Sequence, residues 1–224
     1  MSFKFSPKIV TDGLVLYFDA ANNRSYSGSG NNWLDLSRGG NNGKLENTPT
    51  FNSGNGGNIL FDGTDDYVNI GTQDLGITRD FTISFWANVT KNGVVEIFNK
   101  GYNVPDYGIY LAKVTSNKLT LQSFSPNMNL ETNTIITSGI SNYTAVRINT
   151  NCYWYINGVQ DSTQVITSAN ITQSSLKQWR IGSNFDQVRP TFGGNIYSFS
   201  VYNKGLTQTE VLQNYNTTKT RFGK

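Results

Sequence analysis

The chain has 224 residues, a length that a single β-sandwich domain often reaches. Aromatic residues make up 13% and charged residues 15%, a composition that argues against intrinsic disorder. The net charge is +3 with the basic residues scattered, which argues against a nucleic-acid partner. No stretch approaches the roughly 18 apolar residues of a membrane span, so no membrane partner is expected.

Short apolar stretches, separated by Gly, Asn, Asp, Ser or Pro, predict β-strands along the whole chain. The clearest is residues 81–89, where Phe81, Ile83 and Phe85 share one face that we assign to the core. The single cysteine, Cys152, excludes an intrachain disulfide and is expected to fill core space. The predicted strands are 14–18, 59–61, 67–70, 81–89, 94–99, 107–113, 118–124, 143–149, 153–156, 178–182 and 194–202.

Three turns and one helix are predicted from local signals. Asn92-Gly93, Asn157-Gly158 and Ser116-Asn117 predict tight hairpin turns, because Asn and Gly tolerate positive φ angles. The helix is expected within residues 205–218, where Thr207 with Glu210 three residues later forms a capping-box pattern. Its apolar stripe is predicted to hold Leu206, Val211, Leu212 and Tyr215.

Residues 22–58 are the least regular part, with three turns rich in Gly and Asn. Trp33, Leu45 and Phe51 provide apolar anchors there, so we predict an ordered connection wrapped on a sheet. We predict one domain at 13–216, with an N-terminal arm at 1–12 and a C-terminal tail at 217–224. Polar or basic arms of this kind are expected to order on neighbouring subunits.

Four ordered blocks resemble a known family: FDGTDDYVNIG (61–71), DFTISFWANV (80–89), YWYINGVQ (153–160) and FGGNIYSFSVYNKGLTQTEV (192–211). They are similar to the blocks of concanavalin A-like, laminin G-like and pentraxin-like jelly rolls. The resemblance implies an all-β fold: a jelly-roll sandwich of two antiparallel sheets, each of six or seven strands, with one short C-terminal helix. It also implies sugar or protein ligands on one sheet face or on the rim loops, and calcium in many members.

A narrower resemblance covers residues 10–68 and 211–223. These segments are similar to laminin G-like proteins encoded by tailed bacteriophages, especially those of marine and cyanobacterial hosts. The resemblance implies a virion protein that decorates the capsid or contributes to a tail fibre. Its partners would be other virion proteins and further copies of itself, and it would assemble in the host cytoplasm.

The chain lacks histidine, which removes the usual general base, the Ser-His and Cys-His nucleophile pairs and most zinc sites. Glycosidases on this jelly roll need paired carboxylates, and by resemblance the glucanases carry them as Glu-x-Asp-x-Glu on one strand. The four glutamates, Glu46, Glu96, Glu131 and Glu210, are isolated. We therefore expect no enzyme, and Glu96 is the remaining candidate for a glucanase-like alternative.

Two further clusters are candidate sites. Asp62, Asp65 and Asp66 offer oxygen ligands for calcium, but a turn in which Asp side chains accept from nearby amides explains them more simply. Asn184 and Asp186 pose the same choice. No cofactor is required by either.

Sugar contact would need aromatic rings beside amides and carboxylates. The loop with Tyr102, Asn103, Asp106 and Tyr107 has this mixture, and Trp33 is another candidate. Trp86 faces away from the predicted core, so it either lies under another segment or forms an apolar patch for a partner subunit.

The first hypothesis is accordingly a non-enzymatic virion protein whose sandwich serves for docking. The alternative is a lectin that recognises host or environmental polysaccharide.

Overall fold

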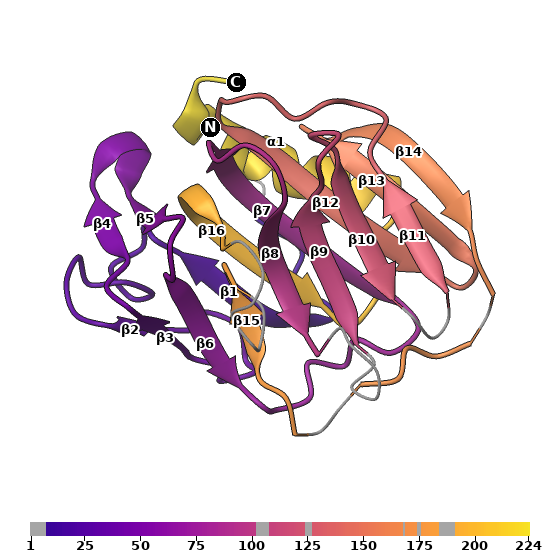
Figure 1. Cartoon of the computed structure of the whole chain (residues 1–224), viewed down its shortest axis with the longest axis horizontal. Helices are drawn as coiled ribbons and strands as arrows, with labels where there is room; N and C mark the ends of the chain where they lie inside the picture. Colours follow the sequence, from indigo (N-terminus) through magenta and orange to yellow (C-terminus); the bar gives the residue numbers. More distant parts are fainter. Residues whose placement is uncertain (1–7, 102–107, 124–126, 168, 174–175, 184–190) are drawn as a thin grey trace, which may run out of the picture.

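The computed structural model describes residues 8–101, 108–123, 127–167, 169–173, 176–183 and 191–224. They form two antiparallel sheets of eight strands each, stacked face to face (Figure 1). The predicted jelly-roll sandwich is confirmed, with more strands in each sheet than the six or seven expected. Among the described residues, no helix combines the length and apolar character that crossing a membrane requires.

The sheet that we call sheet A has the strand order β14-β13-β12-β7-β16-β5-β4, with β1 also paired to β16. Its strands are β1 (Leu14–Asp19), β4 (Thr50–Asn52), β5 (Asn58–Asp62), β7 (Phe81–Val89), β12 (Ser141–Ile148), β13 (Asn151–Ile156), β14 (Val159–Val165) and β16 (Gly193–Tyr202).

The second sheet, sheet B, has the order β11-β10-β9-β8-β15-β6-β3-β2. Its strands are β2 (Asn32–Trp33), β3 (Gly43–Glu46), β6 (Tyr67–Gly71), β8 (Val95–Lys100), β9 (Ile109–Lys113), β10 (Leu119–Ser123), β11 (Met128–Glu131) and β15 (Trp179–Ile181). A 3-10 turn, η1 (Gly54–Gly56), lies between β4 and β5.

All eleven predicted strands are present, and five were not predicted: β2, β3, β4, β11 and β14. Four of them have two to four residues, too few for an alternating pattern to stand out. The fifth, β14, has the polar sequence VQDSTQV and lies at the edge of sheet A. Edge strands need little apolar content, because one side and often one face remain in water.

One apolar core lies between the sheets, built from alternate residues of nearly every strand. Phe81, Ile83 and Phe85 belong to it, as predicted for β7. Cys152 is fully buried and its Sγ lies 3.7 Å from Met128 Sδ, so it fills core space as expected. Burial raises the pKa of its thiol to about 11.

Two of the three predicted hairpins are confirmed. Asn157 and Gly158, with φ angles of 51° and 77°, join the paired strands β13 and β14. Asn117, with φ of 57°, lies in the turn between β9 and β10. The hairpin at Asn92-Gly93 is wrong, because β7 belongs to sheet A and β8 to sheet B. That turn carries the chain between layers.

The predicted helix is α1 (Gln208–Thr218), and it begins with the expected capping box of Thr207 and Glu210. Leu206 and Val211 are buried on sheet A with Val146, Tyr155 and Tyr202. The apolar stripe is wrong at Leu212, which is 44% exposed.

The outer face of sheet A is covered by α1 and the following 3-10 turn, η2 (Lys219–Phe222). Trp86 stacks between Tyr215 and Phe222, with ring centroids 5.7 and 4.2 Å away, and its Nε1 donates to Thr218 Oγ1 at 2.9 Å. Trp86 is therefore buried by its own chain, the first of the two possibilities raised by its position, and leaves no apolar patch there.

Both ends of the described chain also pack on this side. Arg221 forms an ion pair with Asp19 at 2.7 Å and donates to the carbonyls of Asn55 and Gly57. Near the start, the Val10 amide donates to Asn214 Oδ1 at 2.8 Å. The sequence suggested that tail 217–224 orders on a neighbouring subunit; in the structure Thr218, Arg221 and Phe222 of this tail make contacts within their own chain.

Candidate functional site

Trp33 does not form a sugar platform. Its side chain is fully buried in the core, where its ring stacks on Phe18 with centroids 5.0 Å apart. The prediction is wrong because β2 pairs with β3 and turns this tryptophan inward. The other predicted sugar contacts, Tyr102, Asn103, Asp106 and Tyr107, lie outside the described residues, as do Asn184 and Asp186.

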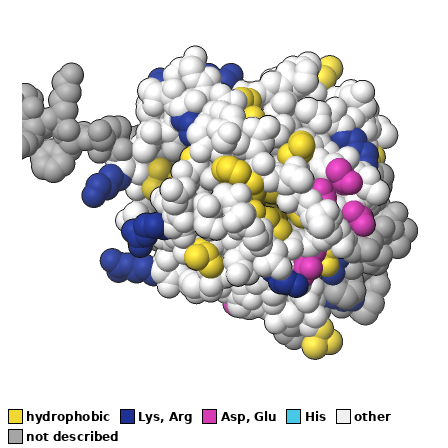
Figure 2. Space-filling view, turned by 90° about the vertical axis from the view of Figure 1, so that its left-hand side faces the viewer, with side chains coloured by type: hydrophobic (Ala, Val, Ile, Leu, Met, Phe, Trp, Pro, Cys, Tyr) yellow, Lys and Arg dark blue, Asp and Glu magenta, His cyan; other side chains and the backbone are white. Residues whose placement is uncertain are grey.

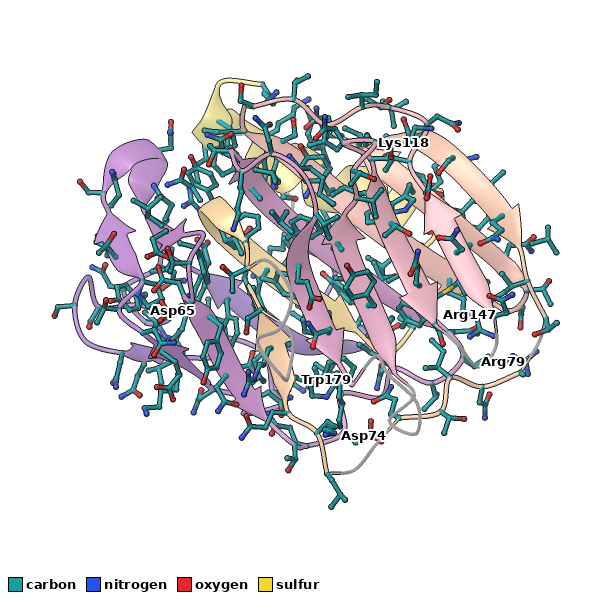
Figure 3. The ribbon with its side chains drawn as sticks, viewed as in Figure 1. Asp65, Asp74, Arg79, Lys118, Arg147 and Trp179 are labelled. Carbon is teal, nitrogen blue, oxygen red and sulfur yellow. The ribbon has the colours of Figure 1, made fainter. Side chains whose placement is uncertain are left out.

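The structure brings Asp62, Asp65 and Asp66 together in the loop between β5 and β6, with carboxylate oxygens within 4.8 Å of one another. Asp62 Oδ1 accepts from the Thr64 amide at 2.7 Å, and Asp66 Oδ2 accepts from the Asp62 amide at 2.9 Å. These are the bonds of the simpler explanation, an Asp-stabilised turn. Figure 3 shows Asp65 beside β6, on the opposite side of the molecule from Arg147.

The carboxyl groups of Asp62 and Asp66 in this loop differ in burial and in pKa. Asp66 is 3% exposed, and desolvation, reinforced by the charges of Asp62 and Asp65, raises its pKa to about 6. The pKa of Asp62 is lowered, first by the hydrogen bond from the Thr64 backbone. The loop thus holds one carboxyl group that resists ionisation beside one that ionises readily.

The carboxylate oxygens of the loop are suitable calcium ligands, but there are too few of them for a complete site. Calcium takes six to eight oxygen ligands, whereas the loop offers three carboxylates, two of which already accept backbone hydrogen bonds. Asp66 Oδ1 is buried and accepts no hydrogen bond, so it is the oxygen most in need of a positive partner. The geometry therefore favours the turn over a complete calcium site.

A larger polar arrangement lies on the outer face of sheet B. In seven neighbouring strands, the residues flanking core positions point away from the core and lie opposite one another in register. We call this set the polar row: Lys44, Asn69, Arg180, Asn99, Tyr110, Gln122 and Asn129. Every member can donate or accept a hydrogen bond.

Neighbouring side chains hold the polar row in place. Asn99 Nδ2 donates to Glu96 Oε2 and to the Ser183 carbonyl, both at 2.7 Å. The Arg180 guanidinium lies 4.4 Å from the centre of the Tyr67 ring. At the other end, Gln122 Nε2 donates to Asn129 Oδ1 at 2.9 Å.

Exposure differs along the polar row. Asn99, Arg180 and Tyr110, in the middle, are buried, whereas Lys44 and Asn129, at its two ends, are exposed. The middle is therefore a fixed hydrogen-bonded frame, and the ends are available to a ligand.

The sequence did not single out the polar row. Each strand shows a polar residue between apolar ones, which is the usual pattern of a half-buried strand. What makes it a row is pairing between strands that lie far apart in the chain, such as β6 with β15 and β15 with β8. A local pattern could have supplied the candidates but not their alignment.

These features define a class of protein, an antiparallel jelly-roll sandwich with one sheet sealed by a C-terminal helix and the other lined by polar side chains. A family model described as the concanavalin A-like lectin/glucanases superfamily (Laminin_G_3) matches residues 62–212. The chain belongs to this family. No curated protein sequence matches the chain.

Solved structures share the fold at low sequence identity. Domain 4 of AbnA, a GH43 extracellular arabinanase from Geobacillus stearothermophilus solved in complex with arabinotriose, is similar with a TM-score of 0.71 and 16% identity. That match covers 92% of this chain and 100% of the domain.

Two larger proteins contain a similar domain. The binding domain of botulinum neurotoxin DC, in complex with SialylT, gives a TM-score of 0.69 and 15% identity, covering 93% of this chain and 52% of that one. Trypanosoma rangeli sialidase in complex with sialic acid gives 0.69 and 11%, covering 99% of this chain and 37% of that one. The chain thus spans about half or less of these two proteins.

Proposed function

We propose that this protein is a non-enzymatic adhesion protein that binds polysaccharide on the outer face of sheet B. The observation that carries the proposal is the polar row, with amide, hydroxyl and cationic groups aligned across seven strands. Sugar hydroxyls need donors and acceptors at fixed spacing, and a sheet supplies that spacing, because neighbouring strands lie about 4.8 Å apart. The frame of Asn99 and Glu96 holds the middle of the row rigid.

The structural neighbours support a carbohydrate ligand. Domain 4 of the arabinanase was solved with arabinotriose, the toxin binding domain with SialylT and the sialidase with sialic acid. Because these chains are at most 16% identical to this one, they suggest a class of ligand and not a particular glycan.

The test is a glycan array followed by titration of the best soluble glycan. Gln122→Ala and Asn129→Ala each remove a side chain from the accessible end of the polar row and are expected to weaken binding roughly tenfold. Gln160→Ala, on exposed strand β14 of sheet A, is the matched control and should bind as wild type does. Unchanged affinity in both row variants would refute the polar row as the site. Tyr107→Ala tests the loop predicted from the sequence.

The absence of catalysis is part of the proposal, and three of the four glutamates support it. Glu46 pairs with Lys44 at 2.9 Å, Glu210 caps α1, and Glu96 is fully buried with Asn99. A glycosidase needs two carboxyl groups on either side of an accessible sugar bond. We expect no release of reducing sugar from array-positive polysaccharides; release that Glu96→Gln abolishes would establish the glucanase alternative.

A place on a phage virion, as capsid decoration or tail-fibre component, is the second proposal. It is supported by the resemblance of residues 10–68 and 211–223 to phage-encoded laminin G-like proteins. The protein would then assemble in the host cytoplasm with virion proteins and with itself. Fractionated particles that contain many copies per head would favour decoration, and absence from purified particles would contradict both placements. Sedimentation would measure the homo-oligomer directly.

Calcium is proposed as an optional ligand of the loop with Asp62, Asp65 and Asp66. The unsatisfied Asp66 Oδ1 supports it, and the turn hydrogen bonds weigh against it. Titration with calcium, followed by the thermal midpoint, tests it: a rise that Asp65→Asn removes would support the site, and no rise would refute it.

A further inference from the structure

A groove of about 590 Å³ lies at the end of the sandwich formed by the irregular segment 22–58. Tyr26 and residues 28–31 form one wall, and Leu45 and residues 47–51 form the other. This segment precedes residues 62–212, which match the family model. Lys44 is the one member of the polar row that lies in it, and Lys44 does not line the groove. Figure 2 views this side of the molecule, with apolar side chains near its centre and acidic ones to the right.

Aromatic rings line the groove. Tyr26 and Phe51 lie 5.4 Å apart at an angle of 36°, Tyr26 buried as part of the core and Phe51 half-buried. The Tyr26 hydroxyl donates to the Gly30 carbonyl at 2.7 Å, and the Leu45 amide donates to the Asn31 carbonyl at 2.7 Å. The first bond fixes the shape of one wall, and the second ties the two walls to each other, so the groove is preformed.

The rim of the groove is polar and uncharged. Asn31, Asn47 and Thr50 are exposed there, and none of the described residues that line the groove is charged. Gly30 has φ of 83°, and a Cβ at that position would meet nothing within 4 Å, so bare backbone is exposed at the rim. Apolar rings below and neutral amides and hydroxyls above match a ligand with one apolar face and several hydroxyls. They offer no ion pair to a phosphate, a carboxylate or an amine.

The rim also contains an unusual backbone conformation. Asn47 and Thr48 have φ angles of 64° and 72°, and a β-branched residue is rarely found there. Asn47 Nδ2 donates to the Asp65 carbonyl at 3.0 Å, which holds the turn against the neighbouring loop. Strained residues of this kind persist only where the surrounding structure holds them in place, and they cluster at ligand sites.

We propose that this groove is a second carbohydrate site, which takes one neutral hexose unit of a polysaccharide. The ring of Phe51 lies along the apolar face of the sugar, and the side chains of Asn31 and Thr50 bond its hydroxyls. This groove is separate from the polar row of sheet B. A polysaccharide that occupies both sites at once would bind more tightly than it binds to either site alone.

The experiment titrates the protein, one probe at a time, with cellohexaose, laminarihexaose and mannohexaose at millimolar concentration, followed by NMR. Phe51→Ala is expected to lower the affinity for the best probe at least tenfold. Because this variant also loses packing, Asn31→Ala and Thr50→Ala are tested as exposed substitutions, with an expected loss of severalfold each. Gln160→Ala is the control and should leave binding unchanged.

The readouts separate this site from the polar row. Shifted Tyr26 and Phe51 ring signals, together with retained binding in Gln122→Ala, would support the groove even if the row binds nothing. No shift of these signals with any of the three probes would overturn it. Concentration-dependent dimerisation that Phe51→Ala abolishes would also overturn it, because the occupant would then be a second copy of the chain.

Discussion

The outer faces of the two sheets differ although the sheets share one core. The outer face of sheet A carries an apolar cluster, with Val146, Tyr155 and Tyr202, and the large ring of Trp86. The chain covers it with α1 and η2. The outer face of sheet B carries the polar row instead, in which Gln122 bonds to Asn129, Asn99 bonds to residues beside the row, and the two ends remain exposed.

This difference separates stability from recognition. Apolar area contributes roughly 25 cal/mol per Å² when it is removed from water, so a helix that covers sheet A is stabilising. Polar side chains gain little from such a cover, because their bonds to water are lost when they are buried. Sheet B therefore keeps polar groups at its surface, where we propose that a sugar binds, while the outer face of sheet A holds the C-terminal segment.

The largest expected effect comes from opening sheet A. Trp86→Ala removes the stacking on Tyr215 and Phe222 and the hydrogen bond to Thr218, and is expected to lower the free energy of unfolding by roughly 3 to 5 kcal/mol. Denaturant unfolding measures it. Trp86→Phe keeps an aromatic ring in place, so its free energy of unfolding should fall by clearly less. Equal losses in the two variants would show that the stack does not hold the C-terminal segment.

The next effect concerns the loop that joins the sheets. The folded protein raises the pKa of Asp66 to about 6, so its stabilising contribution is present below about pH 4 and is lost as the pH rises through 6. Asp66→Asn should remove this loss, and its unfolding free energy relative to wild type should rise by about 2 kcal/mol between pH 4 and pH 7. The measurement is urea unfolding across this range.

The exposed neighbour provides the control for that experiment. Asp65→Asn keeps the buried carboxyl group and should retain most of the wild-type pH dependence. If the difference in unfolding free energy between Asp66→Asn and wild type did not change with pH, the Asp66 carboxyl would not be desolvated.

A smaller effect is expected at the start of the helix that covers sheet A. Thr207→Ala removes the side chain that accepts from the Glu210 amide and should cost about 1 kcal/mol of unfolding free energy. Thr217→Ala, in the same helix but outside the cap, should be close to neutral. Thermal unfolding of the two variants shows whether the cap stabilises the helix that packs on sheet A.

The smallest effect on stability is expected on sheet B. Gln122→Ala should change the unfolding free energy by no more than about 0.5 kcal/mol, because the side chain is partly exposed and its bond to Asn129 competes with water. The same variant is expected to weaken polysaccharide binding on sheet B roughly tenfold. A destabilisation comparable with that of Trp86→Ala would erase the distinction between the two faces.

The sequence alone determined the features that depend on local geometry. Short apolar stretches bounded by turn residues marked eleven strands, Asn157-Gly158 and Asn117 marked two hairpins, and Thr207 with Glu210 marked the helix start. Lack of histidine constrained the chemistry in the same direct way. These signals are read within a few residues, because side-chain direction and φ preference are properties of the local chain.

The tertiary structure alone decided which strands share a sheet and what covers each face. It placed Asn92-Gly93 between layers, turned Trp33 into the core and covered Trp86 with residues more than a hundred positions away. It also aligned the polar row and formed the groove that Tyr26 and Phe51 line. Pairing and burial depend on contacts between distant segments, and a local pattern carries no record of its partner.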